Sequence, residues 1–88
     1  MAASKRQEIY SAIDSERDFQ VQKHKDEQHS MGAWLLLIES ELNEAKLASV
    51  KGGSGRNSIR SELIQVSALC VAALEQHGLH SDNNGREV

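Results

Sequence analysis

Residues 31–55 read MGAWLLLIESELNEAKLASVKGGSG, and this stretch decides how the chain folds. Its first part, residues 31–50, is rich in leucine and alanine and predicts the most apolar helix of the protein. The glycines of residues 51–55 end that helix, because glycine loses more conformational freedom in a helix than any other residue. Since this turn is short, the helix that follows it is expected to lie antiparallel to the first.

Two further helices are predicted, one on each side of this stretch. The first spans about residues 4–25, with Ile9, Ile13 and Phe19 as its clearest apolar positions. The other spans about residues 57–77. Its apolar positions recur at helical spacing, namely Ile59, Leu63, Val66, Leu69, Cys70, Ala73 and Leu74.

Residues with strong capping preferences mark the ends of the predicted helices. Ser30 is expected to cap the helix over residues 31–50, and Asn57 or Ser58 the helix that follows the glycine turn. Gly78 is expected to close that last helix. With no proline in the chain, these signals predict an all-α fold built from three antiparallel helices.

The length and charge of the chain limit the number of domains it can form and the partners it can bind. Its 88 residues allow one small helical domain, residues 1–78, and a polar tail, residues 79–88, that we expect to be disordered. Such a short chain buries little surface, so we expect protomers to pack into a helical-bundle homodimer or homotetramer. The net charge of −3 argues against a nucleic-acid partner.

Cysteine use and hydropathy suggest a location. The only cysteine, Cys70, cannot form an internal disulfide, which is typical of a reducing cytoplasm. The longest apolar run, AWLLLI at residues 33–38, is too short to cross a bilayer. The N-terminal stretch MAASKRQEIY lacks the apolar centre of a signal peptide. We therefore expect a cytoplasmic protein without a membrane partner.

Carboxylates occupy positions of the predicted helices where apolar residues would be expected. Residues three, four and seven positions apart share a helix face, so Glu41 and Glu44 lie among leucines and alanines. Glu62 lies among apolar residues of the next helix, and Gln65 follows one turn later. Antiparallel packing around the glycine turn places Glu41 level with Gln65. It also places Glu44 level with Glu62, so that four polar side chains converge.

Three converging negative charges need compensation, because an unpaired buried carboxylate costs several kcal/mol. Protonation, an ion pair and a bound metal could each supply it. The candidate cations are Lys46, Arg60 and Arg17, of which Arg17 is expected to lie level with Glu41. A single glutamate on an apolar face is more often paired on a groove rim than bound to metal. The convergence of four oxygen-bearing side chains favours Mg²⁺ or Mn²⁺ instead.

The motifs ELNE at residues 41–44 and ELIQ at residues 62–65 resemble a pair of helical motifs found in a known protein family. In the MazG-like all-α nucleoside triphosphate pyrophosphohydrolases, Glu-x-x-Glu on one helix is followed by Glu-x-x-Asp on the next. The surrounding sequence, including ERDFQ at residues 16–20, is also similar to small proteins of phages and mobile elements. The resemblance covers about residues 12–78.

This resemblance implies a hydrolase that uses Mg²⁺, or Mn²⁺, to convert a nucleoside triphosphate to the monophosphate and pyrophosphate. Members of the family assemble as dimers or larger oligomers. The implied catalytic metal ligands are Glu41, Glu44 and Glu62, with Gln65 as the fourth ligand position. The basic residues that could contact the substrate phosphates are Arg17, Lys46 and Arg60.

One position departs from the family motif. Gln65 stands where the family has aspartate, so the site loses one of four negative charges and gains a neutral carbonyl oxygen. The sequence therefore also allows a noncatalytic MazG-like oligomer that binds a nucleotide or a protein partner. Under either interpretation, Trp34 is expected in the core and Cys70 is expected to be buried and unreactive.

Overall fold

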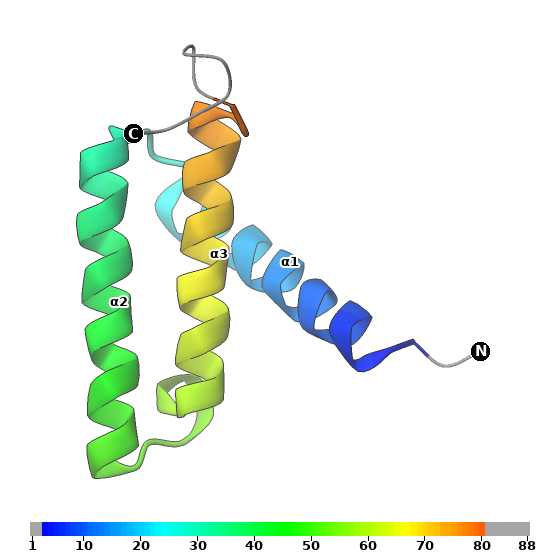
Figure 1. Cartoon of the computed structure of the whole chain (residues 1–88), viewed down its shortest axis with the longest axis vertical. Helices are drawn as coiled ribbons and strands as arrows, with labels where there is room; N and C mark the ends of the chain where they lie inside the picture. Colours follow the sequence, from blue (N-terminus) through cyan, green and yellow to red (C-terminus); the bar gives the residue numbers. More distant parts are fainter. Residues whose placement is uncertain (1–2, 81–88) are drawn as a thin grey trace.

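The computed structural model describes residues 3–80, all of whose regular structure is helical (Figure 1). The elements are α1 (Lys5–His24), α2 (Met31–Lys51), the 3₁₀ turn η1 (Gly55–Asn57) and α3 (Ile59–His77). Each α-helix begins and ends within two residues of its expected bounds, and the all-α prediction is confirmed. Most of the predicted polar tail, residues 81–88, lies outside the described residues.

Serines start all three α-helices. The Oγ atoms of Ser4, Ser30 and Ser58 each accept a hydrogen bond from the backbone N–H three residues later, at 3.1–3.2 Å. At the other ends, the backbone N–H of Gly52 donates to the carbonyl oxygen of Ala48 in α2, and that of Gly78 donates to Leu74 in α3. Both glycines have a positive φ angle, which glycine adopts more easily than other residues. The capping roles expected of Ser30, Ser58 and Gly78 are confirmed.

Helix α3 is the centre of the protomer. Helices α2 and α3 lie side by side and antiparallel, joined by the glycine turn and η1 (Figure 1). Helix α1 packs obliquely on α3, and its N-terminal end projects away from the α2–α3 hairpin. Among the described residues, α1 makes no close backbone approach to α2, so α3 alone joins the other two helices.

The core is small because alanines supply most of it. The buried apolar residues are Trp34, Ala45, Ala68, Ala72 and Ala73. The expected burial of Trp34 is confirmed, with 5% of the residue exposed. The expectation for Cys70 was wrong, because it is exposed and, within residues 3–80, no helix packs against its side of α3. The alanines let the helix backbones approach closely.

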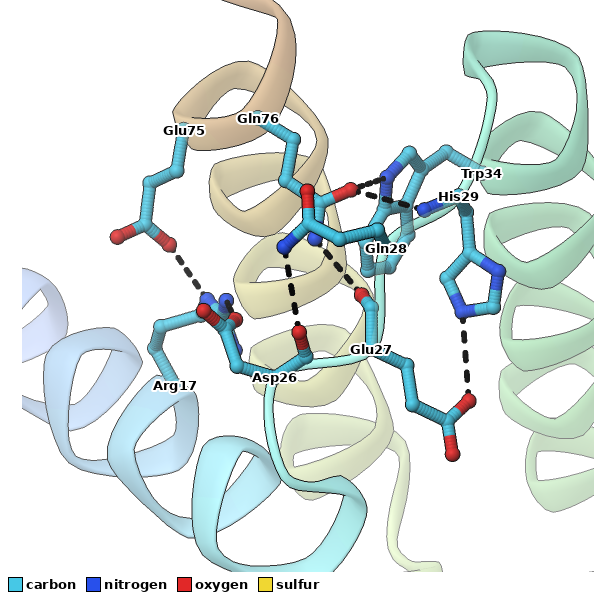
Figure 2. A network of polar contacts seen from close by, with 8 residues as sticks. All are labelled: Arg17, Asp26, Glu27, Gln28, His29, Trp34, Glu75 and Gln76. Atoms are coloured by element: carbon cyan, nitrogen blue, oxygen red, sulfur yellow. Dashed lines mark hydrogen bonds and ion pairs between the residues drawn. The ribbon is translucent and has the colours of Figure 1, made fainter.

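Arg17 ties α1 to the end of α3. This buried arginine donates through Nη2 to Asp26 at 2.7 Å and through Nε to Glu75 at 2.5 Å (Figure 2). Both hydrogen bonds are charge-assisted and therefore stronger than neutral ones. Asp26 has a positive φ of 52° in the turn after α1, a conformation that asparagine and aspartate tolerate best. The Arg17 contact holds that turn against α3.

Gln76 ties the start of α2 to the same end of α3. Its Oε1 accepts hydrogen bonds from Trp34 Nε1 at 2.7 Å and from the backbone N–H of His29 at 3.0 Å (Figure 2). Its Nε2 donates to the backbone oxygen of Glu27 at 2.7 Å. One amide thus satisfies the buried indole N–H and two backbone groups of the segment between α1 and α2.

We predict that Gln76→Leu lowers the free energy of unfolding by about 1–3 kcal/mol, because it leaves the Trp34 N–H without a partner in the core. Urea denaturation followed by Trp34 fluorescence measures the change. Gln28→Leu is the matched control, since the Gln28 amide makes one exposed contact with Asp26 and should change stability by less than about 0.5 kcal/mol. Equal losses in the two variants would contradict the role of Gln76.

Candidate functional site

Two carboxyl groups meet where α2 packs against α3. The carboxyl groups of Glu41 and Glu62 lie within hydrogen-bonding reach of each other. Glu62 is buried, with 4% of the residue exposed, and its Oε2 has no hydrogen-bond partner among the described residues. Glu41 is half-buried. Two negative charges this close repel each other, and a cation between them would relieve that repulsion.

The surroundings of Glu41 favour its protonated form. Burial raises the pKa of this carboxyl above its ordinary value, and the hydrogen bond with Glu62 raises it further. The negative charges of Glu62, Glu44 and Glu16 act in the same direction. All of these influences favour the neutral form of the Glu41 carboxyl.

The other two expected ligands take different positions. Glu44 is exposed, although it is close enough for its charge to affect Glu41. The Nε2 of Gln65 donates to the backbone oxygen of Arg56 at 2.8 Å and to Ser61 Oγ at 3.3 Å. The carboxyl of Glu41 meets that of Glu62, whereas the amide nitrogen of Gln65, the residue expected level with Glu41, bonds to the backbone of Arg56.

The basic residues expected near the acids lie elsewhere. Arg17 serves as the counter-charge of Asp26 and Glu75, although it lines the same cavity as Glu41. Lys46 and Arg60 are both exposed. The structure therefore brings Glu41 and Glu62 together, with the exposed Glu44 nearby. It does not gather the three basic residues, Arg17, Lys46 and Arg60, around these acids.

An ion pair that the sequence did not suggest lies beside the acids. Arg56 donates to both carboxylate oxygens of Glu16, at 3.1 and 3.0 Å, and its guanidinium lies 4.5 Å from the centre of the Phe19 ring. Only 10% of the Glu16 side chain is exposed. The hydrogen bond with Glu16 raises the pKa of Arg56 above its ordinary value. The 40-residue separation of the pair gives no periodic signal in the sequence.

A cavity of about 310 Å³ opens between the three helices on the side of Glu41. Its lining includes Arg17, Gln20, Trp34, Leu37, Glu41 and Leu69. Gln20 Nε2 donates to the backbone oxygen of Gln65 at 3.3 Å, whereas its buried Oε1 has no partner among the described residues. The cavity therefore combines apolar walls with the Glu41 carboxyl.

A second hollow, of about 290 Å³, lies at the turn between α2 and α3. Glu62 and Glu44 line it together with Lys51, Asn57 and the two glycines that follow α2. Glu41 thus borders the cavity near α1, while its partner Glu62 borders the hollow near the turn. The acid pair is the link between these two concave regions.

Comparison with known proteins gives no independent assignment. Searches of protein-family models, curated proteins and solved structures found no match to this chain. Within residues 3–80, no group of three or more histidine, cysteine, aspartate or glutamate side chains is arranged to hold a metal ion. None of the helices in that range is long and apolar enough to span a membrane.

We predict that Glu41→Gln stabilises the protein at pH 7 in EDTA. The pKa of Glu41 is higher in the folded chain than its ordinary value of 4.5, so stability falls as the pH rises from about that value through the folded pKa. A glutamine at position 41 carries no charge, so the variant avoids this loss of stability at higher pH. Its amide N–H can also donate a hydrogen bond to Glu62. Thermal melts between pH 4 and pH 8 should show a gain of a few degrees at pH 7 and little difference at pH 4.

The matched control for this pH dependence is Glu39→Gln, which removes an exposed carboxylate from the same helix. This variant should melt like the parent across the pH range. If both substitutions shift the melting temperature equally, general charge reduction rather than the Glu41–Glu62 contact would explain the effect.

Proposed function

We propose that this chain is a cytoplasmic MazG-like protein that hydrolyses a nucleoside triphosphate to the monophosphate and pyrophosphate with Mg²⁺, as a homodimer or homotetramer. The observation that carries the proposal is the buried Glu41–Glu62 pair, which has an unpartnered oxygen and borders a cavity of about 310 Å³. A cation at the pair would satisfy that oxygen and remove the repulsion between two acids.

The donor chemistry partly fits Mg²⁺. Carboxylate oxygens are its preferred protein ligands, and Mg²⁺ usually takes one or two of them while keeping several waters. Glu41 and Glu62 would hold the ion, with Glu44 near enough to contribute after a change of its exposed side chain. Gln65 could contribute only its side-chain oxygen, because its amide nitrogen bonds to the backbone of Arg56 and to Ser61.

The two concave regions suit different parts of a nucleotide. The cavity near α1 has apolar walls and the Glu41 carboxyl, and the charge of Arg17 is already matched by Asp26 and Glu75. This lining favours a planar base over a phosphate group. The hollow near the turn contains Lys51 and the backbone of two glycines and is the better place for phosphates.

Each group of residues has a separate role in the proposed reaction. Bound Mg²⁺ supplies charge neutralisation for the phosphate oxygens and a lower pKa for the attacking water. The chain's own residues position the reactants: Glu41 and Glu62 hold the ion, and the apolar walls around Trp34 exclude water from the base. The Arg56–Glu16 pair keeps the loop end of α3 against α1.

We predict that Mg²⁺ and Mn²⁺ stabilise the parent protein in a saturable way and change Trp34 fluorescence, since Trp34 and Glu41 line one cavity. Glu41→Gln and Glu62→Gln should abolish both responses. Pyrophosphate release from a panel of nucleoside triphosphates should follow the same pattern, with a loss of at least about 100-fold in each variant.

Glu39→Gln is again the control and should keep metal stabilisation and activity close to those of the parent. If millimolar Mg²⁺ and Mn²⁺ leave the melting temperature of the well-folded parent unchanged, the acid pair is structural and the hydrolase proposal fails. Stabilisation that persists in the Glu41→Gln and Glu62→Gln variants would place the cation elsewhere.

The engagement of Gln65 supports a second candidate function. Its amide joins the Arg56 backbone instead of facing Glu41, as expected for a noncatalytic oligomer that binds a nucleotide or a protein partner. If the chain is such a noncatalytic oligomer, the Gln65→Asp variant should still show no stabilisation by Mg²⁺ or Mn²⁺. For a weakened hydrolase, the added carboxylate should tighten Mg²⁺ binding several-fold in the titration described above.

A further inference from the structure

We propose that α1 is a hinged lid over the cavity beside Glu41, held closed by Arg17 and opened by rotation at Lys25 and Asp26. The cavity is lined by α1, by the segment that follows it, by α2 and by α3. Its volume of about 310 Å³ is at the lower end of the range for small-molecule sites. A ligand larger than the closed cavity therefore requires one wall to move.

The helix α1 is the wall with the weakest apolar attachment. Arg17 is the only buried residue between Lys5 and His24. The apolar residues of α1 are exposed or at most half-buried, and Tyr10 and Phe19 each leave more than two-fifths of their surface exposed. Because buried apolar area normally fixes a helix on its neighbours, α1 depends instead on a few polar contacts.

Two ion pairs supply most of these polar contacts. Arg17 pairs with Glu75 of α3, and Glu16 pairs with Arg56 of η1. The side chains of Glu75 and Arg56 are 55% and 53% exposed, so water already solvates much of both partners. Opening would restore water around Arg17 and Glu16, whose side chains are each 10% exposed. The lid can therefore exchange its ion pairs for hydration while the α2–α3 hairpin stays folded.

The two residues that follow α1 form the hinge. Lys25 and Asp26 have φ angles of 54° and 52°, in the left-handed region that residues other than glycine rarely adopt. Such conformations persist where surrounding contacts hold them, and Arg17 Nη2 donates to Asp26 at 2.7 Å (Figure 2). Loss of that contact lets both residues return to negative φ angles, which changes the direction of the helix before them.

The contacts on either side confine the motion to this hinge. On one side, α1 is a continuous helix that can turn as a unit. On the other side, Gln76 of α3 binds the backbone oxygen of Glu27 and the backbone N–H of His29. Among the described residues, α1 makes no close backbone approach to α2, and its N-terminal end projects away from the hairpin (Figure 1). Helix α2 therefore does not restrict the rotation.

The lid would control the access of any ligand to the cavity, so this inference goes beyond the proposed hydrolase function and does not depend on it. Opening would bring water to Trp34 and Glu41, which line the cavity. It would also expose Arg17, whose charge the closed lid neutralises through Asp26 and Glu75.

Spin labels on the full chain in EDTA can measure the position of α1. Labels on the native Cys70 and on a Ser11→Cys variant report the α1–α3 distance, and labels on Cys70 and a Lys46→Cys variant report the α2–α3 distance as a control. All three positions are exposed. An excess of unlabelled chain restricts the measured distances to pairs within one molecule.

Salt should open the lid of the parent chain. Raising the ionic strength from about 0.1 M to about 1 M shortens the Debye length from about 10 Å to about 3 Å and weakens the two ion pairs. We expect the α1–α3 distance distribution to broaden and move to longer distances, while the α2–α3 distribution stays unchanged. Quenching of Trp34 fluorescence by acrylamide should increase about threefold as the open population grows.

The contact and the hinge can be tested separately by substitution. Arg17→Gln should give the long α1–α3 distances at low salt. Lys25→Asn should keep the lid closed to higher salt, because asparagine adopts the left-handed conformation more readily than lysine. Arg6→Gln is the matched control, since it removes an exposed charge from the same helix and should behave like the parent. Circular dichroism checks that helix content is retained.

Two results would overturn the proposal. The first is a parent α1–α3 distance that stays the same across the salt series, which needs no substitution and so remains informative if Arg17→Gln fails to fold. The second is an α2–α3 distance that changes as much as the α1–α3 distance, which would indicate general loosening of the protein. Since no readout involves metal or nucleotide, failure of the lid leaves the hydrolase proposal standing, and failure of the hydrolase proposal leaves the lid standing.

Discussion

Three consecutive residues at the end of α3 hold the rest of the protomer together. Glu75 accepts from Arg17 of α1, Gln76 binds Trp34 of α2, and His77 Nε2 lies 2.8 Å from the backbone oxygen of His29. Since α1 and α2 make no close backbone approach within the described residues, this end of α3 fixes the position of both. The cavity beside Glu41 lies where α1, the segment that follows it, α2 and α3 come together.

The same arrangement explains why a small domain tolerates buried acids. Burying Glu62 beside Glu41 costs stability unless a proton or a cation lies between them. Replacing such a pair by well-packed apolar side chains is often neutral or stabilising, so stability alone does not explain the two acids.

The sequence predicted the helices well because their signals are local. Serine caps, glycine stops and leucine periodicity act within a few residues, and they placed α1, α2 and α3 within two residues of their observed bounds. The burial of Trp34 and the convergence of Glu41 with an acid of α3 also follow from periodicity and the short turn. Among the described residues, the exposure of Cys70 did not, because a stripe on one helix does not reveal whether another helix covers it.

By itself, the sequence determined an all-helical chain with acids on the inner faces of two neighbouring helices. Only the tertiary structure decided which acids meet. Glu41 meets Glu62 across the two helices, and the amide nitrogen of Gln65 bonds to the backbone of Arg56 in η1. The tertiary structure also decided that Arg17 forms ion pairs with Asp26 and Glu75, whereas Arg56 forms one with Glu16. Long-range ion pairs depend on the crossing angle of α1 over α3, and that angle results from the packing of whole helices rather than from any local pattern.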